Sequence, residues 1–372
     1  MKRLAPLTVV AQSAPHMSNA VNAVMSRPAM EHIGIDVHKN QSQVCILTAD
    51  AELIEKRIRT DRDRFAAVLG SRPKAKILIE ASTESEWVAR CLETLGHEVI
   101  VADPNYAPMY AHRSRRIKTD RRDARALAEA CRIRAYRKAH RAADDRRHIR
   151  GRLAVREALV QTRTKYISLA RALLRREGLR VRPGTSSSFV ERVGELEIPK
   201  PLQREIAPIL KLMKPLNRQI ELATKDVDKI AHQDPTVRRL CTAPGVGSIT
   251  AASFAAVIDT PERFKGAHQV EAYLGLVPRE LSSGEKQRKG RITKTGDRRT
   301  RCLLVEAAWA LLRTRRPAVA PLRAWTERLA ARRGRRVAVV ALARKLAGIL
   351  YAMMRDETEF NDKYWTTEQQ GV

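Results

Sequence analysis

Short apolar runs and amphipathic stretches alternate along the chain between residues 31 and 140. The apolar runs have the length of β-strands and read HIGIDVH, QVCILTAD, KILIE and EVIVADP. Helical periodicity lies between them at residues 61–69 and 85–95, and the basic stretch 115–137 predicts one helix or two. Such alternation is typical of an α/β domain with a central mixed sheet. We therefore predict one α/β domain over residues 31–140.

A different periodicity governs residues 141–235. Apolar residues recur there every seven positions, as in coiled coils, at Leu153, Val160, Ile167 and Leu174. A break rich in Gly, Pro and Ser follows at residues 182–188. The apolar residues of a second seam are Ile206, Leu210, Met213, Leu216, Ile220, Ala223, Val227 and Ile230. Helices with such seams pack on each other or on a second subunit, so we predict a helical coiled-coil spacer.

The rest of the chain completes a predicted α/β plus α organisation. Proline removes a helical hydrogen bond, so Pro208 and Pro215 confine the second spacer helix chiefly to residues 216–231. A mainly helical C-terminal domain is predicted over residues 236–355. Flexible tails are expected at residues 1–30 and 356–372.

Composition adds a strong charge imbalance to this picture. The chain has 71 Lys and Arg against 41 Asp and Glu, which gives a formal net charge of +30. A surface this positive repels itself unless a polyanion covers it, and nucleic acid is the obvious one. A GC-rich genome would raise the Arg count, but it does not explain the net excess.

Cysteine usage and hydropathy indicate the compartment. Five cysteines are scattered, with no C-x-x-C pair, at positions 45, 91, 131, 241 and 302. Neither a disulfide framework nor a zinc site is indicated, and a reducing cytoplasm fits. No apolar run reaches about 18 residues, and residues 1–30 lack a clear cleavage signal, so we expect no membrane partner.

Four carboxylates are the candidate catalytic groups. Asp36 and Glu80 end two predicted strands, where side chains project into the open rim of a sheet. Asp120 and Asp123 are three residues apart in a helix-like segment, which puts them on one face. Each also has an ordinary alternative: Asp36 as a turn residue, Glu80 as a helix cap, and the pair as part of a salt-bridged helix surface.

If these four acids converge, they need cations. Neighbouring carboxylates repel each other and would otherwise take up protons. Two hard divalent ions roughly 3.5–4 Å apart would offset the repulsion and serve phosphodiester chemistry. We predict two Mg²⁺ ions, with Mn²⁺ as the substitute.

Near the C-terminus, LCTAPGVGSITAASFAAVI predicts a helix, a tight turn and a second helix. Gly245 and Gly247 permit unusual backbone angles, and the exposed amides of the second helix are candidates for holding a phosphate. This would be a helix-hairpin-helix-like element for backbone contact with nucleic acid. An ordinary helical turn packed in a core is an equally good interpretation.

A serine in a basic loop follows. Ser283 precedes Gly284, and the predicted nucleic-acid contacts around it are Arg279, Lys286, Arg288, Lys289 and Lys294. On chemistry alone, a serine in such surroundings is better explained as a phosphate ligand than as a nucleophile.

Several of these segments resemble one protein family. IGIDVHK, ILIEAST and KTDRRDARALAEA resemble the N-terminal domain of the DEDD transposases of bacterial insertion sequences, specifically the insertion sequence 110 family with its 1111 subgroup, relatives of the Piv-type invertases. YLGLVP, SSG and GRITKTGD resemble the C-terminal domain of the same transposases. The resemblance covers residues 33–139 and 240–313. The 30-residue leader is extra, and IEAST replaces a more usual Glu-Ala-Thr-Gly form.

The resemblance implies a fold and an active site. It implies a RuvC-like domain of the ribonuclease H-like class, in which the metal-binding acids are Asp36, Glu80, Asp120 and Asp123. It also implies that Ser283 is the nucleophile that links covalently to DNA, with Ser282 as the neighbouring alternative. His38 and Lys39 match the family pattern, but no role follows for them.

Partners and location are implied in the same way. Family members act on donor and target DNA in the bacterial cytoplasm, at the nucleoid, and choose their sites with a structured noncoding bridge RNA. A homo-oligomer, either a dimer or a dimer of dimers, is expected because the acids and Ser283 are separated by the helical spacer.

Two other functions are compatible with the sequence. One is a RuvC-like junction nuclease that uses water, with Ser283 only a phosphate ligand. The other is a non-catalytic nucleic-acid-binding relic of a transposase, which would bind with a steep salt dependence and without cleavage.

Overall fold

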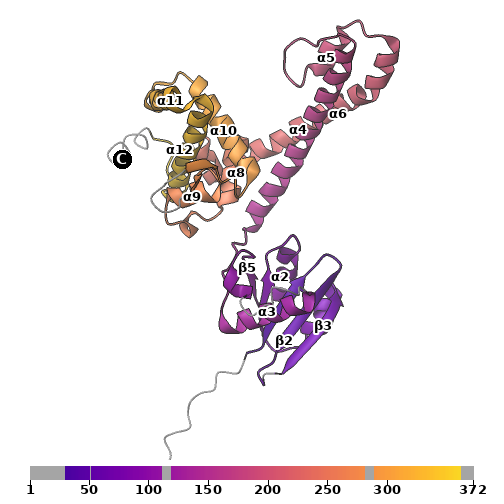
Figure 1. Cartoon of the computed structure of the whole chain (residues 1–372), viewed down its shortest axis with the longest axis vertical. Coiled ribbons are helices and arrows are strands. Elements are labelled where there is room, and N and C mark those ends of the chain that lie inside the picture. The colour runs from indigo at the N-terminus through magenta and orange to yellow at the C-terminus, as the bar shows by residue number, and fades with distance from the viewer. Residues whose placement is uncertain (1–29, 51, 111–118, 281–288, 362–372) are drawn as a thin grey trace, which may run out of the picture. The chain divides into compact units, whose positions relative to one another are not determined.

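A mixed β-sheet organises the first of two units into which the chain divides, Met1–Arg141 and Ala142–Val372 (Figure 1). The computed structural model describes residues 30–50, 52–110, 119–280 and 289–361. The five strands, in the spatial order β3-β2-β1-β4-β5, are β1 His32–Val37, β2 Gln41–Leu47, β3 Leu53–Arg59, β4 Lys76–Glu80 and β5 Glu98–Ala102. β1, β2 and β3 are antiparallel, whereas β4 and β5 continue parallel to β1. The predicted α/β domain with a mixed sheet is confirmed.

Within the five-stranded sheet, β3 is the one strand that the apolar pattern did not predict. It reads LIEKRIR, and only Ile58 of its residues is buried. Charged side chains occupy most of its length because β3 is an edge strand, with one neighbour in the sheet.

Helices cover both faces of the sheet. On one face, α1 (Arg62–Leu69) and α2 (Ser85–Thr94) share a core with β1 and β4. Both helices were predicted from the sequence at these positions. On the other face lies α3 (Asp120–Ile133), whose small residues pack on Leu78 and Cys45. Figure 1 shows α3 running across this face. Within the basic stretch 115–137, the described part therefore forms one helix.

Two long helices lead the second unit. α4 (Asp144–Arg176) and α6 (Lys200–Gln233) lie side by side, and the short α5 (Phe189–Gly194) stands at their far end (Figure 1). Their seams are buried at Leu153 and Ile167 on α4 and at seam positions along α6. The two predicted helices therefore pack on each other.

The second helix is longer than the sequence predicted. α6 begins at Lys200, and Pro208 and Pro215 lie inside it. Each proline is exposed, and so are Arg204 and Lys211, whose carbonyls lose their helical partners. Water can satisfy those carbonyls, so the prolines do not end the helix.

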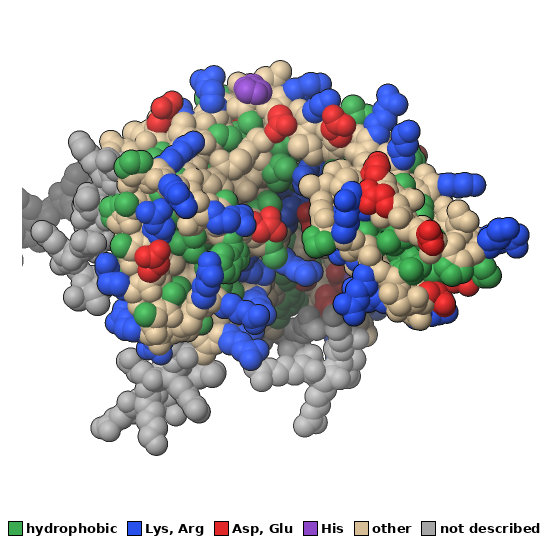
Figure 2. Space-filling model, turned by 90° about the horizontal axis from the view of Figure 1, so that it is seen from above, with side chains coloured by type: hydrophobic (Ala, Val, Ile, Leu, Met, Phe, Trp, Pro, Cys, Tyr) green, Lys and Arg blue, Asp and Glu red, His purple; other side chains and the backbone are tan. Residues whose placement is uncertain are grey.

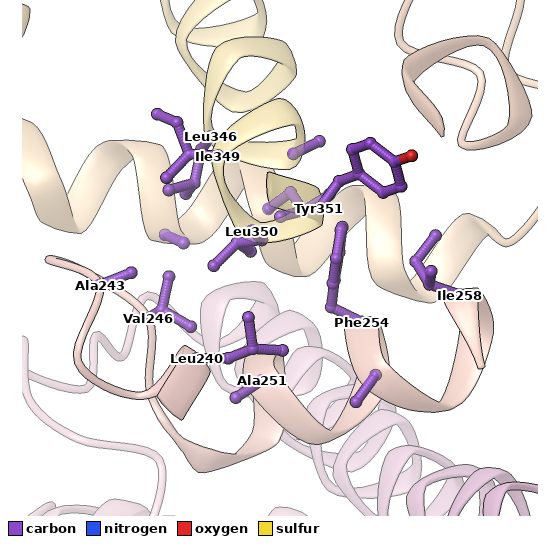
Figure 3. Packing of buried hydrophobic residues seen from close by; sticks show 14 of the residues in the cluster. Leu240, Ala243, Val246, Ala251, Phe254, Ile258, Leu346, Ile349, Leu350 and Tyr351 are labelled. Carbon is purple, nitrogen blue, oxygen red and sulfur yellow. The ribbon is translucent and has the colours of Figure 1, made fainter. Parts of the chain in front are cut away.

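The remaining helices form one core around α8 (Figure 3). They are α7 Pro235–Leu240, α8 Ser248–Ile258, α9 Ala267–Tyr273, α10 Arg298–Arg313, α11 Ala320–Arg333 and α12 Arg335–Arg355. A small hairpin joins β6 (Pro278–Glu280) to β7 (Lys289–Ile292). Among the described helices, α12 alone is long and apolar enough to cross a membrane, but 61% of its apolar window is buried in this core.

Candidate functional site

Asp36 and Glu80 emerge from the same face of the sheet at neighbouring strand ends. β1 and β4 are parallel, and their last paired residues are Ile35 and Ile79. Side chains alternate between the two faces of a strand, so Asp36 lies on the face of Gly34. Glu80 likewise lies on the face of Leu78, which packs on α3. The two carboxylates therefore lie side by side on the face that α3 covers.

Close packing brings the first turn of α3 to the same place. A Cβ atom on Gly34 would lie 2.2 Å from the carbonyl oxygen of Ala124, so only glycine lets α3 approach β1 this closely. Thr119 caps the helix by accepting a hydrogen bond from the amide of Arg122. Asp120 and Asp123 thus lie in the first turn, where the helix dipole favours negative charge.

The electrostatics of Asp36 reflect this gathering. Burial raises the pKa of Asp36, and the nearby charges of Asp123, Asp120 and Glu80 raise it further. The imidazole of His38 lowers the pKa of Asp36. Asp36 is 9% exposed, so its ionised form is poorly solvated by water. A bound cation would offset that cost.

His38 lies between two of the acids. Its Nε2 atom is 3.3 Å from Asp36 Oδ2 and 3.4 Å from Asp120 Oδ1. The ligand atoms of His38, Asp36 and Asp120 all lie within 4.8 Å of one another, which is close enough for one metal ion. The family pattern included His38 without giving it a role, and its position beside Asp36 was the only signal in the sequence. Lys39, the next residue, is exposed.

Tyr110 holds Glu80 and was not predicted at all. Its hydroxyl donates a hydrogen bond to Glu80 Oε2 at 2.5 Å. Tyr110 ends the short 3₁₀ helix Ala107–Tyr110, which has no periodicity that would mark it in the sequence. Glu80 and Asp123 both lie outside the three-residue group around His38.

Two arginines of α3, Arg121 and Arg125, pair with a carboxylate of the sheet. Arg125 donates to Glu55 Oε1 at 2.5 Å, and Arg121 also pairs with Glu55, which lies on β3. These two arginines are therefore held by a carboxylate of the sheet edge, while Asp120 faces His38. This arrangement disfavours the interpretation of Asp120 as part of a helix surface salt-bridged by Arg121 and Arg125.

The donor set fits a divalent cation. Mg²⁺ and Mn²⁺ prefer carboxylate oxygens, and Mn²⁺ also accepts imidazole. Asp36 is buried with a raised pKa, and three further acids act on it electrostatically. Such a group of carboxylates is what a hard cation stabilises.

In the second unit, the predicted helix, turn and helix are present as α7, residues 241–247 and α8. Gly245 has φ +80°, and a Cβ atom there would lie 2.5 Å from the carbonyl oxygen of Ala307 on α10. Gly245 therefore has a packing role. Gly247 precedes α8 with open space around it, and Ser248 donates to Asp228. Phosphate binding at this turn stays a prediction.

The hairpin strands flank the predicted nucleophile. Ser283, Ser282, Lys286 and Arg288 lie outside the described residues, as does the side chain of Lys289. Arg279 on β6 is exposed and donates to the carbonyl of Thr293 at 3.4 Å. Lys294, also exposed, adopts φ +59°.

A buried arginine fixes the segment after this hairpin. Arg301 on α10 donates to the carbonyls of Leu274 at 2.9 Å and Thr295 at 2.6 Å. A Cβ atom on Gly296 would lie 2.0 Å from the carbonyl oxygen of Tyr273. The KTGD segment is therefore locked against the end of α9, which gives the hairpin a rigid base.

Two family models match the chain. One, described as Transposase IS116/IS110/IS902 family, matches residues 237–322. The other is a model of the DEDD transposases of IS110 elements, described as Transposase, and matches residues 33–177. The first match covers α7 to the start of α11, and the second covers the sheet, α3 and α4.

Similar proteins match most of the chain. A probable family 20 transposase from Pseudomonas aeruginosa is 30% identical over 336 residues, 88% of this chain and 98% of the relative. The transposase for insertion sequence element IS1111A from Coxiella burnetii is 30% identical over 88% of this chain and 90% of its own length. The transposase for insertion sequence element IS1328 from Yersinia enterocolitica is 28% identical over 90% of this chain and 99% of its own length. The chain therefore belongs to the IS116/IS110/IS902 family of transposases.

Proposed function

We propose that this chain cuts and rejoins DNA strands for an insertion sequence, using a carboxylate-held pair of divalent cations and a serine nucleophile. Membership of a transposase family implies DNA cleavage and strand transfer in general. The observation that carries the finer proposal is the cluster of Asp36, Asp120 and His38, whose ligand atoms lie within 4.8 Å of one another. The proposed domains are those predicted from the sequence, with residues 31–140 catalytic, 141–235 a coiled-coil spacer and 236–355 the transposase domain.

The proposed fold of the catalytic domain is ribonuclease H-like, of the RuvC type. In its support, the sheet has three antiparallel strands followed by two parallel ones, and α3 crosses the face on which Asp36 and Glu80 lie. The carboxylates thus come from the ends of two central strands and one helix. These are rigid elements, which suits a site that must hold cations precisely.

Four acids would hold the cations, which we take to be Mg²⁺. Asp36, Asp120, Asp123 and Glu80 would each supply carboxylate oxygens, with Tyr110 fixing the Glu80 carboxylate. Bound divalent ions supply Lewis-acid stabilisation of the attacking and leaving oxygens, worth several kcal/mol. His38 contacts Asp36 and Asp120 and would orient both carboxylates.

Ser283 would be the nucleophile, on the resemblance already described. Its Oγ atom forms a bond to the scissile phosphorus while the bond from phosphorus to the 3′ oxygen breaks, and the serine proton ends on that oxygen. The hydrolytic alternative uses water in place of Ser283 and leaves no covalent product.

The proposed partners are donor and target DNA and a structured guide RNA. The net charge of +30 supports a polyanionic partner, and Figure 2 shows Lys and Arg side chains spread over the face it presents. A homo-oligomer is supported by exposed apolar residues on the two long helices, namely Val155, Leu169, Leu212 and Leu222. Such residues suit packing against a second copy.

The test is a mobility assay in which the chain is expressed together with the DNA that flanks its gene. Excised or reinserted copies should be found by sequencing with the wild type. Asp36→Asn and Asp123→Asn should lower their frequency by about 10³-fold or more, since loss of several kcal/mol of transition-state stabilisation has this size. Full activity of either variant would refute the metal-site assignment.

Covalent trapping separates the serine mechanism from hydrolysis. Wild-type protein incubated with those DNA ends should give protein–DNA adducts on denaturing gels. Ser283→Ala should remove them, whereas the matched Ser282→Ala should keep them. Adducts that persist in Ser283→Ala would refute this nucleophile, and cleavage without adducts in the wild type would favour water.

A further inference from the structure

A pocket of about 750 Å³ lies at the far end of the long helix pair, where α4 ends and the chain turns back. Arg171 and Arg175 line it from the last turns of α4, and Arg180 lines it from the segment that follows. The turn between them passes through Gly178, which has φ +74°. None of the described residues that line the pocket is acidic.

The charge of this pocket is not neutralised within the described part of the chain. No described carboxylate forms an ion pair with Arg171, Arg175 or Arg180. The nearby Glu195 pairs with Arg182 instead. The last carbonyls of α4, which would repel an anion, accept hydrogen bonds from Gly178 and Leu179. Three guanidinium groups therefore dominate the electrostatics of the pocket.

A buried arginine builds the wall of the pocket. Arg192 is 5% exposed, and its Nε atom donates to the carbonyl of Ser188 at 3.1 Å. Its other nitrogens donate to the carbonyls of Arg182 and Thr185, which closes the loop 182–188. A Cβ atom on Gly184, a lining residue, would lie 2.7 Å from Arg192 Nε. The wall is thus fixed by a specific network.

One of the three lining arginines is also held in place. The guanidinium of Arg171 stacks over the ring of Phe189, 5.6 Å from its centroid. Phe189 is fully buried in the core that joins α4, α5 and α6. Arg175 is one helical turn beyond Arg171, so both present their donors on one face of α4. Part of the pocket is therefore organised before any ligand binds.

We propose that this pocket binds the phosphodiester backbone of a nucleic acid. A guanidinium group can donate two parallel hydrogen bonds to the oxygens of one phosphate. It is also weakly hydrated, so the loss of its water on binding costs little free energy. The volume exceeds that of one phosphate and accommodates a short stretch of backbone. DNA and RNA share this chemistry. The inference rests on the proposed function, because that function makes nucleic acid the expected polyanion.

The experiment measures binding of the full chain to a DNA duplex and to an RNA hairpin of equal length, over a range of salt concentrations. The test variant is Arg171→Gln, Arg175→Gln and Arg180→Gln together. The matched control is Arg176→Gln, Arg204→Gln and Lys211→Gln, which removes the same charge from exposed positions at the same end of the helix pair. The double variant Arg175→Gln, Arg180→Gln is included because it leaves the stacking of Arg171 intact.

We expect the test variant to bind at least one probe about tenfold more weakly at about 0.1 M salt. For a duplex, the slope of log K against log salt should fall by about 0.9 for each lost phosphate contact. The control variant should keep the slope of the wild type. The probe with the larger loss identifies whether DNA or RNA occupies the pocket.

Equal slopes and affinities in the test variants and the control would overturn the inference. Weaker binding of an acidic polypeptide by the test variant, with nucleic-acid binding unchanged, would overturn it in favour of a protein partner. Failure of the proposed function is distinguishable, because the wild type would then show no Asp36-dependent cleavage, whether or not it binds nucleic acid. Failure of the pocket alone would leave wild-type binding and Asp36-dependent cleavage in place.

Discussion

Gly34 of β1 lies in direct backbone contact with Ala124 of α3, because a Cβ atom on Gly34 would stand 2.2 Å from the Ala124 carbonyl oxygen. The amide nitrogen of Ala128 would be equally close. This contact sets the depth at which α3 lies on the sheet. It therefore also sets where the first turn, with Asp120 and Asp123, stands relative to Asp36.

Gly34→Ala should displace α3 and disturb the carboxylate cluster. Backbone atoms cannot yield as a flexible side chain would, so we expect a loss of about 1–3 kcal/mol in the free energy of unfolding. Mobility of the element should fall more steeply than stability, since about 1 Å of misplacement can cost about 10²-fold in rate. Denaturant titration and the mobility assay measure the two effects.

Gly151→Ala is the matched control for this variant. Gly151 lies within α4, and nothing stands within 4 Å of a Cβ atom there. Alanine should stabilise the helix by about 0.5–1 kcal/mol and leave mobility unchanged. Equal behaviour of the two variants would show that the contact at Gly34 does not position the acids.

The raised pKa of Asp36 predicts how the metal-free protein responds to pH. A raised pKa means that the folded state binds the proton more tightly than the unfolded chain does. Folding is thus favoured by protonation, and stability is lost as pH rises from the ordinary value of 3.8 through the raised value. At neutral pH and with chelator present, Asp36→Asn should be more stable than the wild type, and below pH 3.8 the difference should vanish.

Added Mg²⁺ should reverse this order. A cation that binds only the folded state stabilises it by mass action. Thermal unfolding should therefore shift upwards with Mg²⁺ in the wild type and shift less in Asp36→Asn. An Asn variant that is less stable than the wild type in chelator would mean that burial does not penalise the Asp36 carboxylate.

Arg301→Met should loosen the base of the β6–β7 hairpin. It removes hydrogen bonds to the carbonyls of Leu274 and Thr295 and leaves the first of them buried without a donor. We expect a cost of about 2–4 kcal/mol in the free energy of unfolding. The yield of covalent adduct should also fall, because the KTGD segment would no longer be fixed. Arg298→Met changes an exposed residue of the same helix and should alter neither quantity.

The sequence predicted the parts of the fold whose signal is local. β1 and β4 are buried apolar runs, and their terminal acids, Asp36 and Glu80, stand out because a charge interrupts each run. The edge strand β3 was not predicted, because edge positions tolerate charged residues and β3 therefore lacks an apolar run. The prediction that Pro208 and Pro215 limit the second spacer helix was wrong. Both prolines lie inside α6, where the carbonyls that lose a hydrogen-bond partner belong to exposed residues.

The parts of the site that depend on distant contacts could not be predicted. Tyr110 reaches Glu80 across 30 residues of sequence, and no periodicity marks it. The role of Gly34 becomes visible only when α3 is placed on the sheet. Arg171 and Arg180 look like two among 71 basic residues until the fold gathers them around one pocket.

The proposed metal site is tested most directly by a crystal structure of the full chain with Mn²⁺, recorded at the Mn absorption edge. If the four acids hold the cations, one or two anomalous peaks should lie within about 2.5 Å of carboxylate oxygens of Asp36 and Asp123, and two peaks would be roughly 3.5–4 Å apart. Glu80 and Asp120 should also face the peaks. A map without a peak at Asp36, or with these four carboxylates turned to separate surfaces, would show that the four acids do not share a metal site.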